Sequence, residues 1–219
     1  MRKLTAREFN SCLCPEARTQ IVDFKTFKKW HTRTKSASIE CFFSQIERVT
    51  QCKDHITARF TSGTVIKAYF GGYYERIDPN GKIIVKGDSK SKCIDSNHIR
   101  IFVKGGSVPL ELFIAVCSDI MRNEMPLSYK GWTANVMDGS GSVDNAKQLG
   151  ICPNFHPDNI EWCLYADGNT HEGMARLIFH LTKRVYRFSA NDRKLREVAQ
   201  TASPEVLRRF CDERLDVVK

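Results

Sequence analysis

The sequence predicts an α+β fold, in which a β-rich middle section leads into a ββα unit and both ends are helical. Two kinds of periodicity support this prediction. Between residues 55 and 103, apolar and polar residues alternate with the period of two that is typical of half-buried strands. Residues 110–121 are instead almost continuously apolar, as in a buried helix, and Pro126 limits how far that helix extends.

The N-terminal part is predicted to be helical and basic. Phe24, Phe27 and Trp30 recur at a spacing of three, which places them on one helix face and leaves the cations of residues 24–35 on the other. Packing of the aromatic rings in the core and contact of the cations with phosphates are both compatible with this pattern. Apolar residues at 39, 42, 43, 46 and 49 predict that residues 39–49 form a further helix.

Turn signals divide the middle section into strands. Ser62-Gly63 separates a strand at residues 55–60 from one at 65–70, and residues 78–81 form a turn before a strand at 83–85. Residues 98–103 form the next predicted strand.

The C-terminal part is also predicted to be helical. Apolar residues share one face of residues 174–186, and residues 194–199 continue the helical pattern. Ser203 and Pro204 open a last helix, with serine as the N-cap and proline at the first helical position. The last two helices are compatible with a DNA-binding helix-turn-helix, although this arrangement is also common in proteins that do not bind DNA. We therefore divide the chain into regions 1–54, 55–97, 98–180 and 181–219.

Composition indicates an anionic partner. The chain has 34 Lys and Arg against 25 Asp and Glu, a formal charge of +9, which favours nucleic acid; solubility alone is the alternative. No apolar run is long enough to span a bilayer, so no membrane partner is expected. The nine scattered cysteines, without a secretion signal, predict reduced thiols in the cytoplasm, which would be the host cytoplasm for a phage-encoded protein.

Charge clustering also selects candidate DNA contacts in the two basic helical regions. These are Lys25, Lys28, Lys29, Arg33, Lys183, Arg184, Arg187, Arg193, Lys194 and Arg196.

Residues 133–171 contain the most informative motifs. A predicted strand ends in Asn135-Val136-Met137-Asp138-Gly139, an Asn159-Ile160-Glu161-Trp162 segment follows a loop, and Asn169 and His171 come next. In this order the motifs resemble the HNH homing endonucleases of phages and introns, over about residues 98–175. The resemblance implies a ββα unit around one divalent metal, which would be magnesium or manganese in an active enzyme.

Carried over residue by residue, the resemblance places Asn135 and Asn169 at or near metal-ligand positions and makes Asn159 the residue that holds the turn. Val136 stands where the family has the histidine that activates water, and counting from Trp162 places the family asparagine at Gly168. Because valine can neither take a proton nor bind a metal, no residue at this position supplies the general base, which contributes roughly 10²–10⁴-fold to the rate of such reactions. No cofactor is then expected.

The leading hypothesis is a catalytically inactive DNA-binding protein derived from such an enzyme, used in phage or mobile-element regulation or interference. The alternative is an active metal-dependent nickase in which His156 or His171 replaces the missing base. A protein-binding module with an incidentally basic surface is a third hypothesis. Cys152, His156, Cys163 and His171 are zinc-ligand types, but their spacing matches no strong signature, so zinc is not expected.

Overall fold

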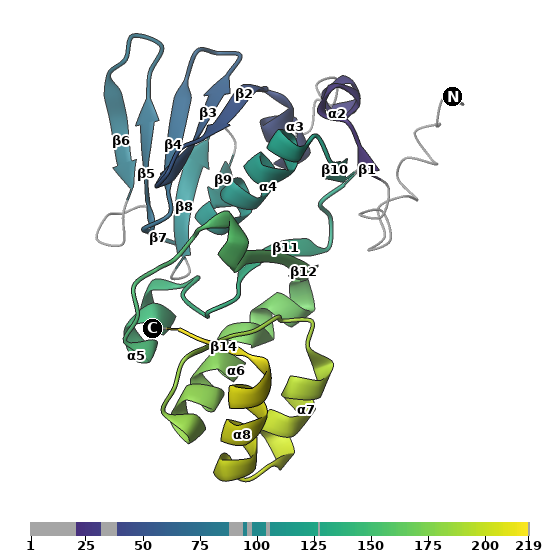
Figure 1. The fold of residues 1–219 in the computed structure, drawn as a ribbon. Coiled ribbons are helices and arrows are strands. Elements are labelled where there is room, and N and C mark those ends of the chain that lie inside the picture. The colour runs from purple at the N-terminus through teal and green to yellow at the C-terminus, as the bar shows by residue number, and fades with distance from the viewer. Residues whose placement is uncertain are drawn as a thin grey trace.

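The computed structural model describes residues 21–31, 39–87, 94–95, 98–103, 106–126 and 128–218. Its helices and strands form a mixed α+β fold with several small sheets, as the sequence predicts (Figure 1). None of the helices within these ranges is both long enough and apolar enough to cross a membrane.

The largest sheet has five antiparallel strands in sequence order. They are β2 (Ile46–Gln51), β3 (His55–Phe60), β4 (Val65–Tyr69), β5 (Tyr73–Ile77) and β6 (Ile83–Gly87). The alternation seen in the sequence gives this sheet one buried face, which includes Ile56, Ala58, Ile66 and Ala68. Each strand follows its neighbour through a short turn, and the predicted hairpin of residues 55–60 and 65–70 is confirmed as β3 and β4. The sequence patterns did not predict β5.

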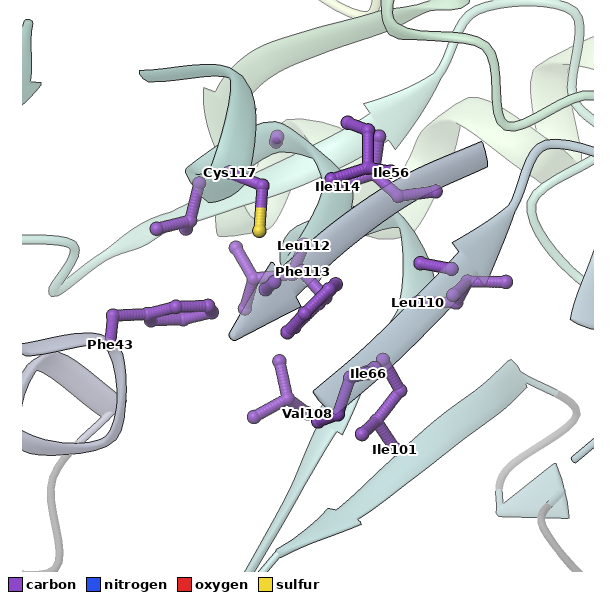
Figure 2. Close-up of a cluster of buried hydrophobic side chains, with 14 of the residues drawn as sticks. Phe43, Ile56, Ile66, Ile101, Val108, Leu110, Leu112, Phe113, Ile114 and Cys117 are labelled. Atoms are coloured by element: carbon purple, nitrogen blue, oxygen red, sulfur yellow. The ribbon is translucent and has the colours of Figure 1, made fainter. Parts of the chain in front are cut away.

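Helix α4 (Leu110–Arg122) covers the buried face of this sheet. Phe113 is fully buried in the cluster of apolar side chains that includes Ile56 and Ile66 of the sheet (Figure 2). Its ring centroid lies 6.0 Å from that of Phe43, which precedes the sheet in the chain. Because the helix is apolar nearly all round, it also contacts strands on its other sides.

One predicted helix is wrong in extent. Residues 39–49 form α3 (Ile39–Ser44) and then enter β2 after Gln45. Ile46 and Val49 pair with Phe60 and Ala58 of β3, with a bulge between Ile46 and Arg48. The bulge shifts the strand's alternation, so the apolar spacing matches a helix although tertiary pairing makes the second half a strand.

Shorter strands complete the N-terminal part. Strand β1 (Ile21–Val22) pairs with β10 (Met125–Pro126), and β8 (His98–Val103) lies between β7 (Ile94–Asp95) and β9 (Gly106–Pro109). Helix α2 (Phe24–His31) follows β1 and buries Phe27 and His31.

The central motifs form a hairpin followed by a helix. Strand β11 (Trp132–Val136) pairs antiparallel with β12 (Ile160–Leu164), and α6 (Tyr165–Thr182) follows directly. The connection between the strands holds α5 (Val143–Leu149) and the 3₁₀ turn η2 (Pro157–Asn159). Helix α6 begins nine residues before the predicted 174 and ends before Lys183, which adopts a left-handed conformation.

The C-terminal helices pack against α6 and form a second core. Helices α7 (Arg193–Thr201) and α8 (Pro204–Arg214) follow β13 (Tyr186–Arg187), which pairs with β14 (Asp216–Val217). The Ser203 hydroxyl accepts a hydrogen bond from the Val206 N–H, so the predicted N-cap is confirmed. Tyr186, predicted to end a helix, lies in β13 instead.

Candidate functional site

The Asp138-Gly139 turn ends β11 and directs the chain away from the hairpin. Asp138 Oδ1 accepts a hydrogen bond of 2.9 Å from the Ser140 N–H, and Gly139 has a φ of 78°. A Cβ at Gly139 would lie 2.9 Å from the Ala175 Cβ on α6, so both the backbone conformation and the close contact require glycine.

The Asn135 side chain is buried and is held by a carboxylate. Its Nδ2 donates a 3.0 Å hydrogen bond to Glu161 Oε1, across the hairpin on the paired residue of β12. Glu161 also accepts from the Ser189 hydroxyl and from the Ala190 N–H, both at 2.6 Å. The amide of Asn135 and the carboxylate of Glu161 therefore connect the hairpin to the segment that leads into α7.

Neither Val136 nor Gly168 supplies a chemical group at the positions that the resemblance makes important. Val136 is 3% exposed and packs against the Gly141 backbone. At Gly168 a Cβ would lie 2.7 Å from Thr133 Cγ2 and 3.2 Å from Cys163 Sγ. The close approach of α6 to β11 thus excludes any side chain at Gly168.

Asn159 holds the loop that precedes β12. Its Nδ2 donates to the Asn154 carbonyl at 2.8 Å, and its own carbonyl accepts from the Met137 N–H at 2.9 Å. These contacts agree with the predicted turn-holding role. The side chain of Asn169, the other predicted metal ligand, lies outside the described residues.

His171 is buried and faces away from any solvent-reachable site. It has no exposed surface, its Nε2 lies 3.1 Å from the Phe188 carbonyl oxygen, and its ring packs on the Phe188 ring at 4.3 Å. Burial lowers the pKa of His171 to about 4, so the ring is neutral at pH 7. It is a packed core residue, and its position argues against a role as the replacement base.

His156 is a structural cap. It accepts a hydrogen bond from the Asp158 N–H at the start of η2, and its ring meets the Phe70 ring edge-on. The residues considered for zinc are also separated in environment, because Cys152 is exposed while Cys163 and His171 are buried. Across the described ranges, no group of three or more His, Cys, Asp or Glu residues is placed to hold a metal ion.

A pocket of about 380 Å³ lies beside the hairpin and α6, and it contains a histidine that the sequence did not single out. His98 of β8, Glu111 of α4 and Glu172 of α6 line it together with Asn135 and Val136. Arg100, Thr133, Tyr165 and Gly168 also contribute to its wall.

The imidazole of His98 lies between two carboxylates. Its Nδ1 is 3.1 Å from Glu111 Oε1, in ion-pair contact without the alignment of a hydrogen bond, and its Nε2 is 3.9 Å from Glu172 Oε1. The contact with Glu111 raises the pKa of His98, although burial opposes it. Glu111 is 6% exposed and its Oε2 has no hydrogen-bond partner in the described structure, while Glu172 accepts from the Ser142 hydroxyl.

This arrangement suits proton transfer. A buried carboxylate that contacts one ring nitrogen fixes the orientation of an imidazole and leaves the second nitrogen available to the pocket. Sequence reasoning missed it because His98, Glu111 and Glu172 are far apart in the chain and belong to no shared motif. The only signal was a histidine at the first residue of a predicted strand.

The ten predicted DNA contacts do not form one surface. Helix α2 and helices α7 and α8 lie at opposite ends of the molecule (Figure 1). Arg33 lies outside the described residues. Of the other nine side chains, five are exposed and have no side-chain partner among the described residues, namely Lys25, Lys29, Lys183, Arg193 and Lys194.

The remaining four cations make contacts within the protein. Lys28 donates to the Ile46 carbonyl, and Arg187 donates to the Asp158 carbonyl. Arg184 pairs with Asp212, and Arg196 pairs with Asp167. These four side chains therefore have structural roles, which reduces the candidate surface to the exposed five.

We found no match to this chain among family models, curated proteins or solved structures.

Proposed function

We propose that this chain is a DNA-binding protein derived from an HNH-type endonuclease, and that it has lost the reaction at the positions that the family uses. The order of hairpin, glycine turn and helix supports the ancestry. Val136, which stands at the position of the base, is a packed side chain, and Gly168 has no room for a ligand. The unit then serves as a binding platform.

The observation that carries the binding proposal is the position of Arg193 and Lys194. Both are exposed in the first turn of α7. The same turn is fastened to the ββα unit, since Arg196 pairs with Asp167 of α6 at 3.1 Å and Asn191 donates to the Trp162 carbonyl. Two free cations are thus held rigidly beside the hairpin, where they would contact phosphates.

A mobility-shift titration with duplex DNA at several salt concentrations tests this role. Because each phosphate contact contributes about 0.9 to the salt slope, we expect Arg193→Gln/Lys194→Gln to weaken binding and to reduce the slope by about 2. Lys53→Gln/Lys82→Gln removes the same charge from exposed turns of the five-stranded sheet and should leave duplex binding unchanged. Binding that is absent, insensitive to salt, or equally weakened in both variants would favour the protein-binding module.

A second candidate, metal-dependent DNA nicking with a relocated histidine, is favoured by His98. This side chain reaches the pocket that Asn135, Val136 and Gly168 line, whereas His156 and His171 do not. In such a reaction His98 Nε2 takes a proton from water while Glu111 holds the ring. A magnesium ion in phosphate-cutting sites is commonly bound by one or two carboxylates and the substrate, and Glu172 and Glu111 are the carboxylates that line this pocket.

Plasmid nicking in magnesium or manganese distinguishes the two candidates. If His98 is the general base, His98→Ala and His98→Gln should both lower the nicking rate by roughly 10²-fold or more, with unchanged circular dichroism. His180→Ala, at an exposed position of α6, is the matched control and should nick at the wild-type rate. No nicking by the wild type, or nicking that survives both His98 variants, would remove this candidate.

A further inference from the structure

The face of the five-stranded sheet opposite α4 carries an organised set of cations and aromatic rings. Alternation along the strands places one set of residues on this face, which we call the outer face: Arg48, Thr50, His55, Thr57, Arg59, Val65, Lys67, Tyr69, Tyr73, Glu75 and Ile77. Among the described elements, α4 packs on the opposite face.

Two arginines stand directly opposite each other on this face. Arg48 of β2 and Arg59 of β3 are cross-strand partners, and both are exposed. Neither makes an ion pair or a hydrogen bond with a described side chain. Like charges in directly opposed positions destabilise a sheet, so this pair has a cost that a bound anion would offset.

The neighbouring cation is differently placed. Lys67 of β4 stands opposite Glu75 of β5, and the Glu75 carboxylate accepts a hydrogen bond of 3.2 Å from the Tyr69 hydroxyl. In the register Glu75 stands between Lys67 and Lys86 of β6, and neither arginine makes an ion pair with a described side chain.

Aromatic rings form a row at the other end of the same face. The rings of Tyr69 and Tyr73 are stacked at 4.1 Å with an interplanar angle of 11°, and His55 lies 4.9 Å from Tyr69 on the other side. Tyr73 is 40% exposed, so the row ends in a ring surface that a further planar group can reach. His55 and Arg59 are four positions apart on β3, a distance of roughly 13 Å along the strand.

We propose that the outer face binds single-stranded nucleic acid, with phosphates at Arg48 and Arg59 and a base stacked at the Tyr73 end of the aromatic row. Cations with nearby aromatic rings are the combination that single strands require, because phosphates provide charge and unpaired bases provide exposed ring faces. A duplex keeps its bases stacked internally and cannot use the aromatic row. This surface is separate from α7, so the inference goes beyond the proposed duplex binding.

Fluorescence anisotropy with a short, unstructured, labelled oligonucleotide measures this binding on the full chain. We expect Tyr73→Ala to weaken binding about tenfold, in line with the loss of one stacked base, while Tyr73→Phe retains it. Arg48→Gln/Arg59→Gln should reduce the salt slope by about 1.4, which is 0.7 for each lost phosphate contact with a single strand.

The controls separate a built surface from general charge. Lys147→Gln/Arg176→Gln removes two exposed cations from α5 and α6 and should leave single-strand binding unchanged. The inference is overturned if this control weakens binding as much as the arginine variant, or if Tyr73→Ala has no effect. Polyphosphate that competes as well as the oligonucleotide also overturns it, because polyphosphate has no bases.

Discussion

The imidazole of His171 lies between the ring and the carbonyl oxygen of Phe188, with no exposed surface. His98, in contrast, lies at a pocket between two carboxylates. These surroundings shift the pKa values of the two histidines in opposite directions. Burial lowers the pKa of His171, and the contact with Glu111 raises the pKa of His98. At the scale of single residues, the surroundings decide which histidine is structural and which is available for chemistry.

His171 should make the fold sensitive to acid. Its pKa is about 4 in the folded chain against 6.5 in the unfolded chain, so only the unfolded chain takes up the proton between these values. The stability that depends on the neutral ring is complete above pH 6.5 and is lost as the pH falls, by about 3 kcal/mol at pH 4. We expect urea unfolding of His171→Leu to lack this part of the pH dependence.

His180→Gln provides the comparison for that measurement, because it removes an exposed histidine of the same helix. Its unfolding free energy should follow the wild-type dependence on pH. His98 contributes in the other direction, since its stabilisation is present at low pH and is lost as the pH rises through its folded pKa. If the unfolding free energy of His171→Leu falls with decreasing pH as steeply as that of the wild type, protonation of His171 is not the cause of the acid sensitivity.

At the scale of elements, the contact of α6 with the hairpin explains the positions of two glycines. Gly139 and Gly168 lie where the Cβ of any other residue would meet a side chain closer than 3.0 Å. Tight packing of the helix on the strands thus replaces the polar side chains that the resemblance expected in this region. The unit is held by shape, together with the hydrogen bonds of Glu161.

Substitution of two glycines on α6 measures this contact. Gly168→Ala forces a Cβ to within 2.7 Å of Thr133 Cγ2, so we expect a loss of roughly 1–3 kcal/mol despite the better helix propensity of alanine. Gly173→Ala places its Cβ where nothing lies within 4 Å and should stabilise the chain by up to about 1 kcal/mol. Equal effects of both changes in urea unfolding would show that packing at Gly168 is not tight.

At the scale of the whole molecule, two hydrophobic cores are joined at the ββα unit. One core includes Phe113, the sheet and Val136, and the other includes Ile178, Leu195 and Leu207. The exposed cations are distributed over both parts. They lie on α2, after the C-terminal end of α6, at the N-terminal end of α7 and on the outer face of the sheet. Within the described residues, these exposed cations therefore do not form one continuous basic groove.

Local patterns were sufficient for much of this fold. The strand at His98–Val103, the helix that begins at Leu110 and the capped start of α8 agree with the sequence prediction, because alternation, apolar density and N-cap chemistry act over a few residues. The boundary between α3 and β2 was not predictable, since strand pairing with β3 decides it. The exact start of α6 likewise depends on the end of β12.

The sequence by itself determined the α+β class, the order of the central motifs and the absence of a histidine at position 136. The pocket depended on the tertiary structure, which brings His98, Glu111 and Glu172 together from three elements. The tertiary structure also decided which cations are free, because the pairs of Arg184 with Asp212 and of Arg196 with Asp167 need contacts between segments that are distant in the chain. The physical reason is the same in each case: residue chemistry is local, whereas burial, pairing and proximity arise only when the elements pack.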